Sequence, residues 1–243
     1  MDTQQTISHE QLAANIAHVR SNIAEAAQQA GRTPNEITLV AVSKTMPIEL
    51  VRMAYNLEAL GSHGVTNFGE NRVQEALPKI AAFHPSDVRW HMIGHLQRNK
   101  IKAVLDAGVE VVHSVDSLRL AEELNARAER MDKRLAVMIQ VNCSREPQKF
   151  GVAVGAATFL AEMITSLQHL RLTGLMTMGP LSDTPEAARP AFARLRELMD
   201  DMHRDRIGGP DLRHLSMGMS QDYPIAIEEG ATILRIGSAL FES

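Results

Sequence analysis

Residues 38–44 read Thr-Leu-Val-Ala-Val-Ser-Lys, an apolar run that ends in a serine and a lysine. Near the other end of the chain, residues 231–238 read Ala-Thr-Ile-Leu-Arg-Ile-Gly-Ser. Strands of a parallel sheet are covered on both faces, so they tend to be apolar throughout instead of alternating with polar residues. The two stretches therefore predict the first and the last strand of a parallel sheet.

Six more strand-like runs lie between these two, and segments with helical spacing separate them. The eight predicted strands are residues 37–43, 65–68, 88–93, 109–113, 135–141, 170–176, 212–215 and 231–236. The clearest helical segments between them are residues 47–60, 70–83, 117–131 and 185–206. Eight strands alternating with helices favour a closed parallel barrel over an open doubly wound sheet. We therefore predict one α/β domain over residues 1–243, a (β/α)8 barrel of the TIM type.

An extra helix is predicted before the first strand. Ser8 and Gln11 fit a capping box, and Gly31 ends the helix. Apolar residues follow the cap at helical spacing, at Leu12, Ile16, Val19 and Ile23. This N-terminal helix should cover part of the barrel or of its outer ring of helices.

The composition excludes several classes of protein. Of the 243 residues, 44% are apolar, which is ample for one core, and the formal net charge of -4 gives no electrostatic attraction to nucleic acid. Cys143 is the only cysteine, so no disulfide can form within the chain. No apolar run approaches the ~20 residues of a membrane span, and the polar first ten residues are unlike a signal peptide. We expect a cytoplasmic protein with no nucleic-acid or membrane partner.

Residues able to carry chemistry gather at one end of the predicted barrel. The reactive face of such barrels is the rim formed by the carboxyl ends of the strands. Polar, charged and glycine residues predicted to lie near this rim are Lys44, Asn67, Ser216, Arg235, Gly237 and Ser238. The loops after strands seven and eight often bind phosphate, and there Ser216, Gly237 and Ser238 would offer hydroxyl groups and backbone amides.

Lys44 and Arg235 narrow the choice of ligand. Strand one adjoins strand eight when the barrel closes, and partial desolvation beside Arg235 would favour the neutral lysine amine that an imine requires. An arginine inside an apolar strand is costly unless it meets an acceptor, and a ring nitrogen is one such acceptor. An amine, an arginine and a phosphate site together suit pyridoxal 5′-phosphate better than a nucleotide.

Other residues have simpler interpretations. His91 and His95 lack metal-binding spacing and no cysteine cluster accompanies them, so no metal site is predicted. Cys143 has no clear base beside it, which favours a structural role. Three polar residues after strand five either belong to the site or form a loop network: Asn142, Glu146 and Lys149.

Read together, six segments resemble the pyridoxal phosphate homeostasis protein family, whose barrel is similar to the N-terminal domain of alanine racemase. They are residues 39–44, residues 67–75 (Asn-Phe-Gly-Glu-Asn-Arg-Val-Gln-Glu), residues 90–100, the spaced set Asn142, Glu146, Lys149 and Gly151, residues 215–222 (Leu-Ser-Met-Gly-Met-Ser-Gln-Asp) and residues 235–241. Each segment alone is modest evidence, but their order and spacing span nearly the whole chain.

The resemblance implies the barrel of fold-type III pyridoxal phosphate proteins. By that likeness Lys44 carries the cofactor as a Schiff base, Arg235 faces the pyridine nitrogen and Asn67 lies near the ring. The same likeness gives the phosphate to Ser216, Gly237 and Ser238.

Two functions remain open at this point. The first, which we favour, is a non-catalytic protein of vitamin B6 homeostasis that holds pyridoxal phosphate as a lysine aldimine and buffers it or delivers it to apo-enzymes. The second is a pyridoxal phosphate-dependent amino-acid racemase. Related racemases take a second acid/base group from a separate domain, for which we expect no room here, and nothing places Tyr55 or Tyr223 opposite Lys44. The same expectation favours a monomer.

Overall fold

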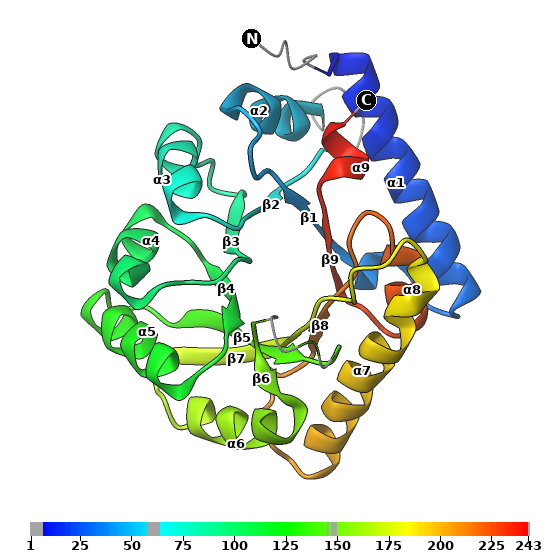
Figure 1. The fold of residues 1–243 in the computed structure, drawn as a ribbon. Helices are drawn as coiled ribbons and strands as arrows, with labels where there is room; N and C mark the ends of the chain where they lie inside the picture. Colours follow the sequence, from blue (N-terminus) through cyan, green and yellow to red (C-terminus); the bar gives the residue numbers. More distant parts are fainter. Residues whose placement is uncertain (1–6, 58–63, 145, 147–149, 243) are drawn as a thin grey trace.

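Eight parallel strands close into a barrel, and helices surround it (Figure 1). The computed structural model describes residues 7–57, 64–144, 146 and 150–242. The barrel strands are β1 (Thr38–Val42), β2 (Asn67–Glu70), β3 (Arg89–Met92), β4 (Val111–Val115), β5 (Leu135–Asn142), β7 (Leu170–Met176), β8 (His214–Ser216) and β9 (Ile233–Ile236). Pairing of β9 with β1 and of β4 with β5 closes the ring. The predicted (β/α)8 barrel is confirmed.

The helices that follow the strands form the outer layer. They are α2 (Ile48–Asn56), α3 (Val73–Ala82), α4 (Ile101–Ala107), α5 (Leu118–Arg130), α6 (Val154–Thr165), α7 (Arg189–Arg204), α8 (Tyr223–Glu228) and α9 (Ser238–Phe241). Shorter elements are the 3-10 turns η1 (Pro34–Glu36), η3 (Arg98–Lys100) and η4 (Pro185–Ala188), and strand β6 (Val152–Ala153), which pairs with the end of β5. Within the described residues, no helix is both long and apolar enough to cross a membrane.

The predicted N-terminal helix is α1 (His9–Gln29), and it lies along α8 and α9 on the outside of the barrel (Figure 1). The Ser8 hydroxyl caps it by accepting a hydrogen bond from the Gln11 amide at 3.1 Å. The Gln11 side chain donates to Asn15 instead of returning to Ser8, so the structure shows only half of a capping box. Helix α1 therefore covers the two helices that follow the last two strands of the barrel, β8 and β9.

The core has two parts because residues along each strand alternate between the two faces of the sheet. Ala41 belongs to the large apolar layer between the strands and the helices. Its neighbour Val40 faces the other way and packs with Met138 and Ile233 in a separate small cluster. A polar layer lies beside this cluster, since Arg235 follows Ile233 by two residues and pairs in register with Val40.

The second strand starts two residues later than predicted. It covers Asn67–Glu70 because Asn67 pairs with Arg89, the first residue of β3. The prediction that Asn67 lies at the carboxyl end of its strand is therefore wrong, since it is the first residue of β2. Several other strands also begin late, because buried apolar residues such as Val109 and Leu212 precede them without joining the sheet.

Candidate functional site

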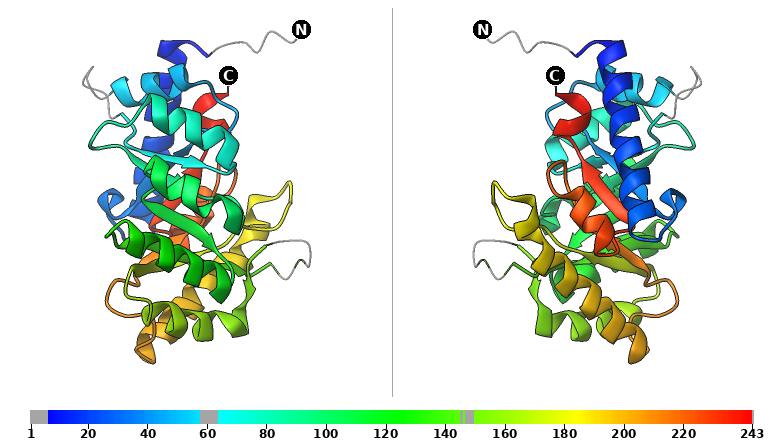
Figure 2. Two further views of the ribbon diagram at one scale, coloured as in Figure 1. Left: turned by 90° about the vertical axis from the view of Figure 1, so that its left-hand side faces the viewer. Right: turned by 90° about the vertical axis from the view of Figure 1, so that its right-hand side faces the viewer.

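A cavity of about 540 Å³ opens at the carboxyl ends of the barrel strands. Four of the predicted site residues line it: Lys44, Arg235, Gly237 and Ser238. The loop between β7 and η4 adds residues 179–182 to the wall, and it projects from one face of the barrel in both side views (Figure 2). The sequence thus predicted correctly which strand ends meet, and the loop closes one side of the space between them.

Lys44 is held on a tight turn immediately after β1. The Met46 amide donates to the Ser43 carbonyl at 3.0 Å, and Thr45 has a φ of 63°, in the left-handed region that branched side chains rarely adopt. The Thr45 amide donates to Glu75 Oε2 at 2.9 Å, which helps to hold this strained residue in place. The turn leaves Lys44 exposed, so the expectation of a partly desolvated amine is wrong: the cavity is open to solvent at this position.

A buried ion pair between Lys79 and Glu70 holds the residue that precedes Lys44. Lys79 Nζ donates to Glu70 Oε1 at 2.7 Å and to the Ser43 carbonyl at 2.5 Å. The Ser43 hydroxyl donates to the same Glu70 oxygen at 2.6 Å. Glu70 is 1% exposed, and charges in such surroundings are stable only when paired and hydrogen-bonded. The cluster ties the end of β1, just before Lys44, to β2 and α3.

Arg235 is a buried cation at the edge of the cavity. Its guanidinium donates from Nη1 to the Ser216 hydroxyl at 2.8 Å and from Nη2 to the Thr177 carbonyl at 2.9 Å. Burial lowers the pKa of Arg235 to about 10, and the carboxylate of Asp222 opposes that shift, so the side chain stays protonated at neutral pH. The expected acceptors for an arginine in an apolar strand are thus present.

Hydroxyl groups and main-chain amides after β8 and β9 face each other across one side of the cavity. Ser220, Gly237 and Ser238 all line it. Ser220 Oγ accepts a hydrogen bond from the Ala239 amide at 3.2 Å, which leaves the proton of the Ser220 hydroxyl available for a second partner. Ser220 was not among the predicted site residues, although it belongs to the matching segment 215–222.

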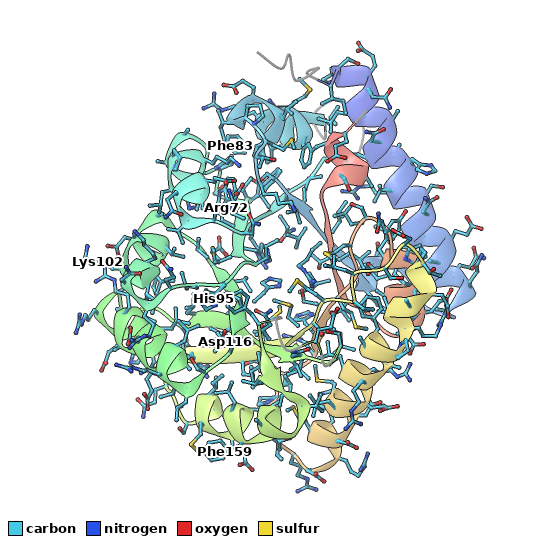
Figure 3. All side chains as sticks on the ribbon, viewed as in Figure 1. Arg72, Phe83, His95, Lys102, Asp116 and Phe159 are labelled. Carbon is cyan, nitrogen blue, oxygen red and sulfur yellow. The ribbon has the colours of Figure 1, made fainter. Side chains whose placement is uncertain are left out.

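His95 and Phe150 form the opposite side of the mouth. Their rings stack at a centroid distance of 4.3 Å, and His95 Nδ1 lies 3.5 Å from the Asp116 carboxylate. Figure 3 shows His95 and Asp116 close together on the inner side of the helical ring, whereas Lys102 and Phe159 lie on its outer surface. Phe150, Leu181 and Met219 are exposed apolar side chains, and all three border the cavity.

Asn71 is a candidate site residue that the strand assignment missed. It lines the cavity one residue after β2, in the position expected for Asn67. Within the described part of the chain, its Oδ1 atom is buried and has no hydrogen-bond partner. An unpaired buried acceptor costs stability unless a ligand or water satisfies it, which marks Asn71 as a candidate ligand contact.

Gly94 allows the chain after β3 to lie directly against Asn71. A Cβ atom at this position would overlap the Asn71 carbonyl, so we expect Gly94→Ala to lower the free energy of unfolding by about 1–3 kcal/mol. Gly155→Ala is the matched control, because nothing lies within 4 Å of an added Cβ there and alanine is favoured in helix α6. Urea unfolding of both variants tests this, and equal stabilities would contradict the packing we describe.

Comparisons with known proteins assign the chain to a family. The family model described as "Alanine racemase, N-terminal domain" matches residues 14–243. Proteins named "Pyridoxal phosphate homeostasis protein" from Pseudomonas aeruginosa and Aquifex aeolicus are 44% and 42% identical over 230 and 226 residues. These matches cover 95% and 93% of this chain, and 94% and 95% of the relatives. The chain belongs to the pyridoxal phosphate homeostasis protein family.

A solved structure supports the same assignment. PipY of Synechococcus elongatus PCC7942, solved with pyridoxal phosphate bound, has a TM-score of 0.79 at 33% sequence identity. The match covers 95% of this chain and all of that one. The family resemblance predicted from the sequence is confirmed.

Two residues that the family resemblance assigned to the cofactor lie outside the cavity lining. Ser216 is completely buried, and its hydroxyl contacts Arg235 and His113. Asn67 Oδ1 contacts His91 Nε2 at 3.1 Å. Their predicted contacts with the phosphate and the ring stay predictions.

Two of the three polar residues after β5, Asn142 and Glu146, contact each other, as the interpretation of a loop network expects. Asn142 Nδ2 donates to the Glu146 carbonyl at 2.8 Å, and Ser144 Oγ donates to Asn142 Oδ1 at 3.2 Å. Lys149 lies outside the described residues. Cys143 is buried, which raises the pKa of its thiol to about 11 and agrees with a structural role.

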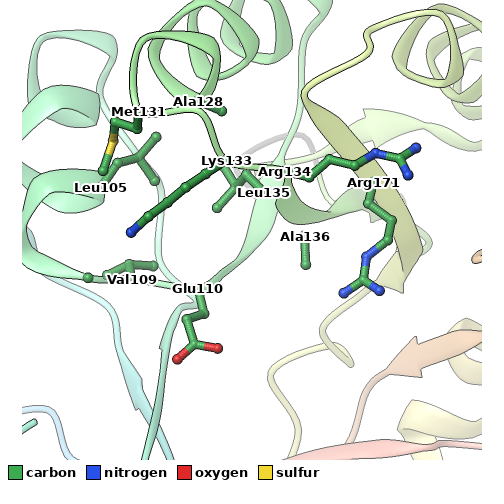
Figure 4. Close-up of a pocket in the computed structure, with 11 residues that line it drawn as sticks. Leu105, Val109, Glu110, Ala128, Met131, Lys133, Arg134, Leu135, Ala136 and Arg171 are labelled. Atoms are coloured by element: carbon green, nitrogen blue, oxygen red, sulfur yellow. The ribbon is translucent and has the colours of Figure 1, made fainter. Parts of the chain in front are cut away.

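A second pocket, of about 230 Å³, lies at the amino ends of β4, β5 and β7 (Figure 4). Lys133, Arg134 and Arg171 contribute its positive charges, but their side chains point in different directions and share no common focus (Figure 4). The described residues contain no group of three or more histidine, cysteine or acidic side chains that could hold a metal ion. The cavity at the carboxyl ends is therefore the site on which our proposal rests.

Proposed function

We propose that this protein binds pyridoxal 5′-phosphate in the cavity at the carboxyl ends of its barrel and serves vitamin B6 homeostasis by holding and releasing it. The observation that carries the proposal is that one cavity is lined by Lys44, by Arg235 and by a group of three residues after β8 and β9. These three are Ser220, Gly237 and Ser238. An amine, a cation and a set of hydroxyl and amide donors are the groups that an aldehyde, a pyridine nitrogen and a phosphate require.

The residues of this cavity fit that cofactor. Ser220, Gly237 and Ser238 would hold the phosphate, and Arg235 would face the pyridine nitrogen. Asn71 Oδ1, an acceptor that lacks a partner within the described residues, would face a polar group on the ring. Bound pyridoxal phosphate supplies an aldehyde that combines reversibly with amines, and among the described residues Lys44 is the lysine that lines this cavity.

The relatives support a role in homeostasis. Proteins that match nearly the whole chain carry that name, and PipY was solved with pyridoxal phosphate bound. We propose that the present protein passes the cofactor to apo-enzymes and works as a monomer.

The positions of the two tyrosines favour a carrier over the alternative, a racemase. Racemisation needs a second acid/base group opposite the lysine. Tyr223 is buried and its hydroxyl accepts from Asn22 on α1, while Tyr55 donates to Asp87 on the outer surface.

Cofactor transfer tests this proposal. The protein is loaded with pyridoxal phosphate, freed of excess by gel filtration and mixed with a pyridoxal phosphate apo-enzyme whose activity is then followed. We expect the apo-enzyme to gain activity while the carrier loses its absorbance, with no racemisation of L-alanine by the carrier itself. Retention of the cofactor together with rapid racemisation would favour the racemase.

A further inference from the structure

A row of hydrogen-bonded side chains crosses the barrel interior and ends on Arg235. The Ser216 hydroxyl, bound to Arg235, lies 2.9 Å from His113 Nδ1. His113 Nε2 lies 2.8 Å from His91 Nδ1, and His91 Nε2 lies 3.1 Å from Asn67 Oδ1. The row joins β9, β8, β4, β3 and β2, and Ser216, His113 and His91 are at most 4% exposed. We call these four residues (Asn67, His91, His113 and Ser216) the polar row.

The directions of the hydrogen bonds in the polar row follow from Arg235 at one end and from the assigned orientation of the Asn67 amide at the other. An arginine can only donate, so Ser216 Oγ accepts from Arg235 and has one proton left to give. At the far end Asn67 Oδ1 accepts, while its Nδ2 atom donates to Thr66 Oγ1 at 3.3 Å. In this orientation of Asn67, His91 donates from Nε2 and accepts at Nδ1. A turned amide, with Nδ2 donating to His91 and the Thr66 hydroxyl donating to Oδ1, would reverse the row, and the position of the ring protons distinguishes the two orders.

The same reasoning assigns His113. It donates from Nε2 to His91 and accepts at Nδ1 from the Ser216 hydroxyl, so each donor in the row meets an acceptor. Such an order requires both imidazoles to be neutral, because a protonated ring would set two donors against each other. Burial agrees with this: it lowers the pKa of His91 to about 3 and the pKa of His113 well below its ordinary value.

We propose that His91 and His113 are positioning residues that act through Ser216 to hold the Arg235 guanidinium against the ring nitrogen of the cofactor. This role rests on the proposed function. It also means that the single proton of the Ser216 hydroxyl is used within the polar row. This proposal replaces the predicted contact of Ser216 with the phosphate, which is then left to Ser220, Gly237 and Ser238, three of the residues that line the cavity.

The ring nitrogen that carries the proton in His91 and in His113 can be determined without any cofactor. Nitrogen-15 NMR of histidine-labelled protein, with ring signals assigned through their couplings, distinguishes the two neutral tautomers from each other and from the cation. We expect His91 and His113 both to carry the proton on Nε2, unchanged between about pH 5 and pH 8, where an exposed histidine titrates. A proton on Nδ1 of either ring, or titration of either ring in that range, would overturn the proposal.

The affinities of Ser216 variants for pyridoxal phosphate and for pyridoxal show whether Ser216 acts on Arg235 or binds the phosphate. We expect Ser216→Ala to weaken pyridoxal phosphate and pyridoxal, which has no phosphate, by the same factor of about ten, the effect of one hydrogen bond to a charged group. Ser216→Thr keeps the hydroxyl and should restore both affinities, whereas Ser220→Ala should weaken pyridoxal phosphate alone.

Loss of affinity for pyridoxal phosphate only, in Ser216→Ala, would show that Ser216 binds the phosphate and would overturn the proposal. If the wild-type protein bound neither compound, the proposed function itself would fail. The two failures are distinguishable, because the NMR spectra report the polar row in the absence of either ligand.

Discussion

Lys44→Ala should abolish covalent attachment of pyridoxal phosphate. Lys44 is the one lysine that lines the carboxyl-end cavity within the described residues, and it follows β1, which pairs with β9, the strand that contains Arg235 and leads into Gly237. The wild-type protein with cofactor should show an absorbance band near ~420 nm that borohydride removes, and the variant should show neither. Without the covalent link, the dissociation constant should rise on the order of 100-fold, since phosphate and ring contacts remain.

The control for this prediction is Lys133→Ala. Lys133 lines the pocket at the opposite end of the barrel, so its removal should leave the band and the affinity unchanged (Figure 4). Circular dichroism of both variants checks that the fold is retained. An undiminished, borohydride-sensitive band in Lys44→Ala would mean that another amine holds the cofactor.

Lys79→Met should cost about 3–5 kcal/mol of the free energy of unfolding, because it leaves the Glu70 carboxylate buried without its cation. Glu70 Oε1 would keep only the Ser43 hydroxyl, and its Oε2 atom has no partner within the described residues even in the wild-type protein. Urea unfolding at neutral pH measures the loss. The Ser43 carbonyl also loses one of its two donors and keeps the Met46 amide, so the Lys44 turn should loosen and cofactor capture should slow.

Lys102→Met is the matched control. Its ammonium pairs with Asp106 at 3.0 Å, but 77% of the side chain is exposed, and such surface pairs contribute about 0–1 kcal/mol. The double variant Glu70→Gln/Lys79→Met removes the unpaired charge and should recover part of the stability. A loss below about 1 kcal/mol in Lys79→Met would show that the buried pair does not hold this rim together.

Much of the fold could be predicted from the sequence because each strand is buried on both faces. The strand predicted at residues 170–176 is β7 (Leu170–Met176), and the apolar spacing of α1 matches its buried face. Strand starts were less accurate, since Val65 and Val88 are as buried as strand residues although they precede the sheet. Apolar character reports burial, whereas only pairing between strands decides where the sheet begins.

The site was predicted less completely for the same reason. Lys44, Gly237 and Ser238 lie within two residues of the ends of their strands, so their place on the rim did not depend on register. Asn67 and Asn71 stand four residues apart on one segment, and only the pairing of β2 with β3 shows that Asn71 reaches the cavity. Nothing in the spacing of His91, His113 and Ser216 indicates that three separate strands bring them into one row.

Reduction of the loaded protein with borohydride, followed by proteolysis and peptide mass spectrometry, tests most directly whether the carboxyl-end cavity is the cofactor site. The chain has six lysines that could carry the label: Lys44, Lys79, Lys100, Lys102, Lys133 and Lys149. We predict one phosphopyridoxyl group per chain, on the peptide that contains Lys44. A label on a different lysine, or one spread over the surface lysines with Lys44 unmodified, would contradict the account.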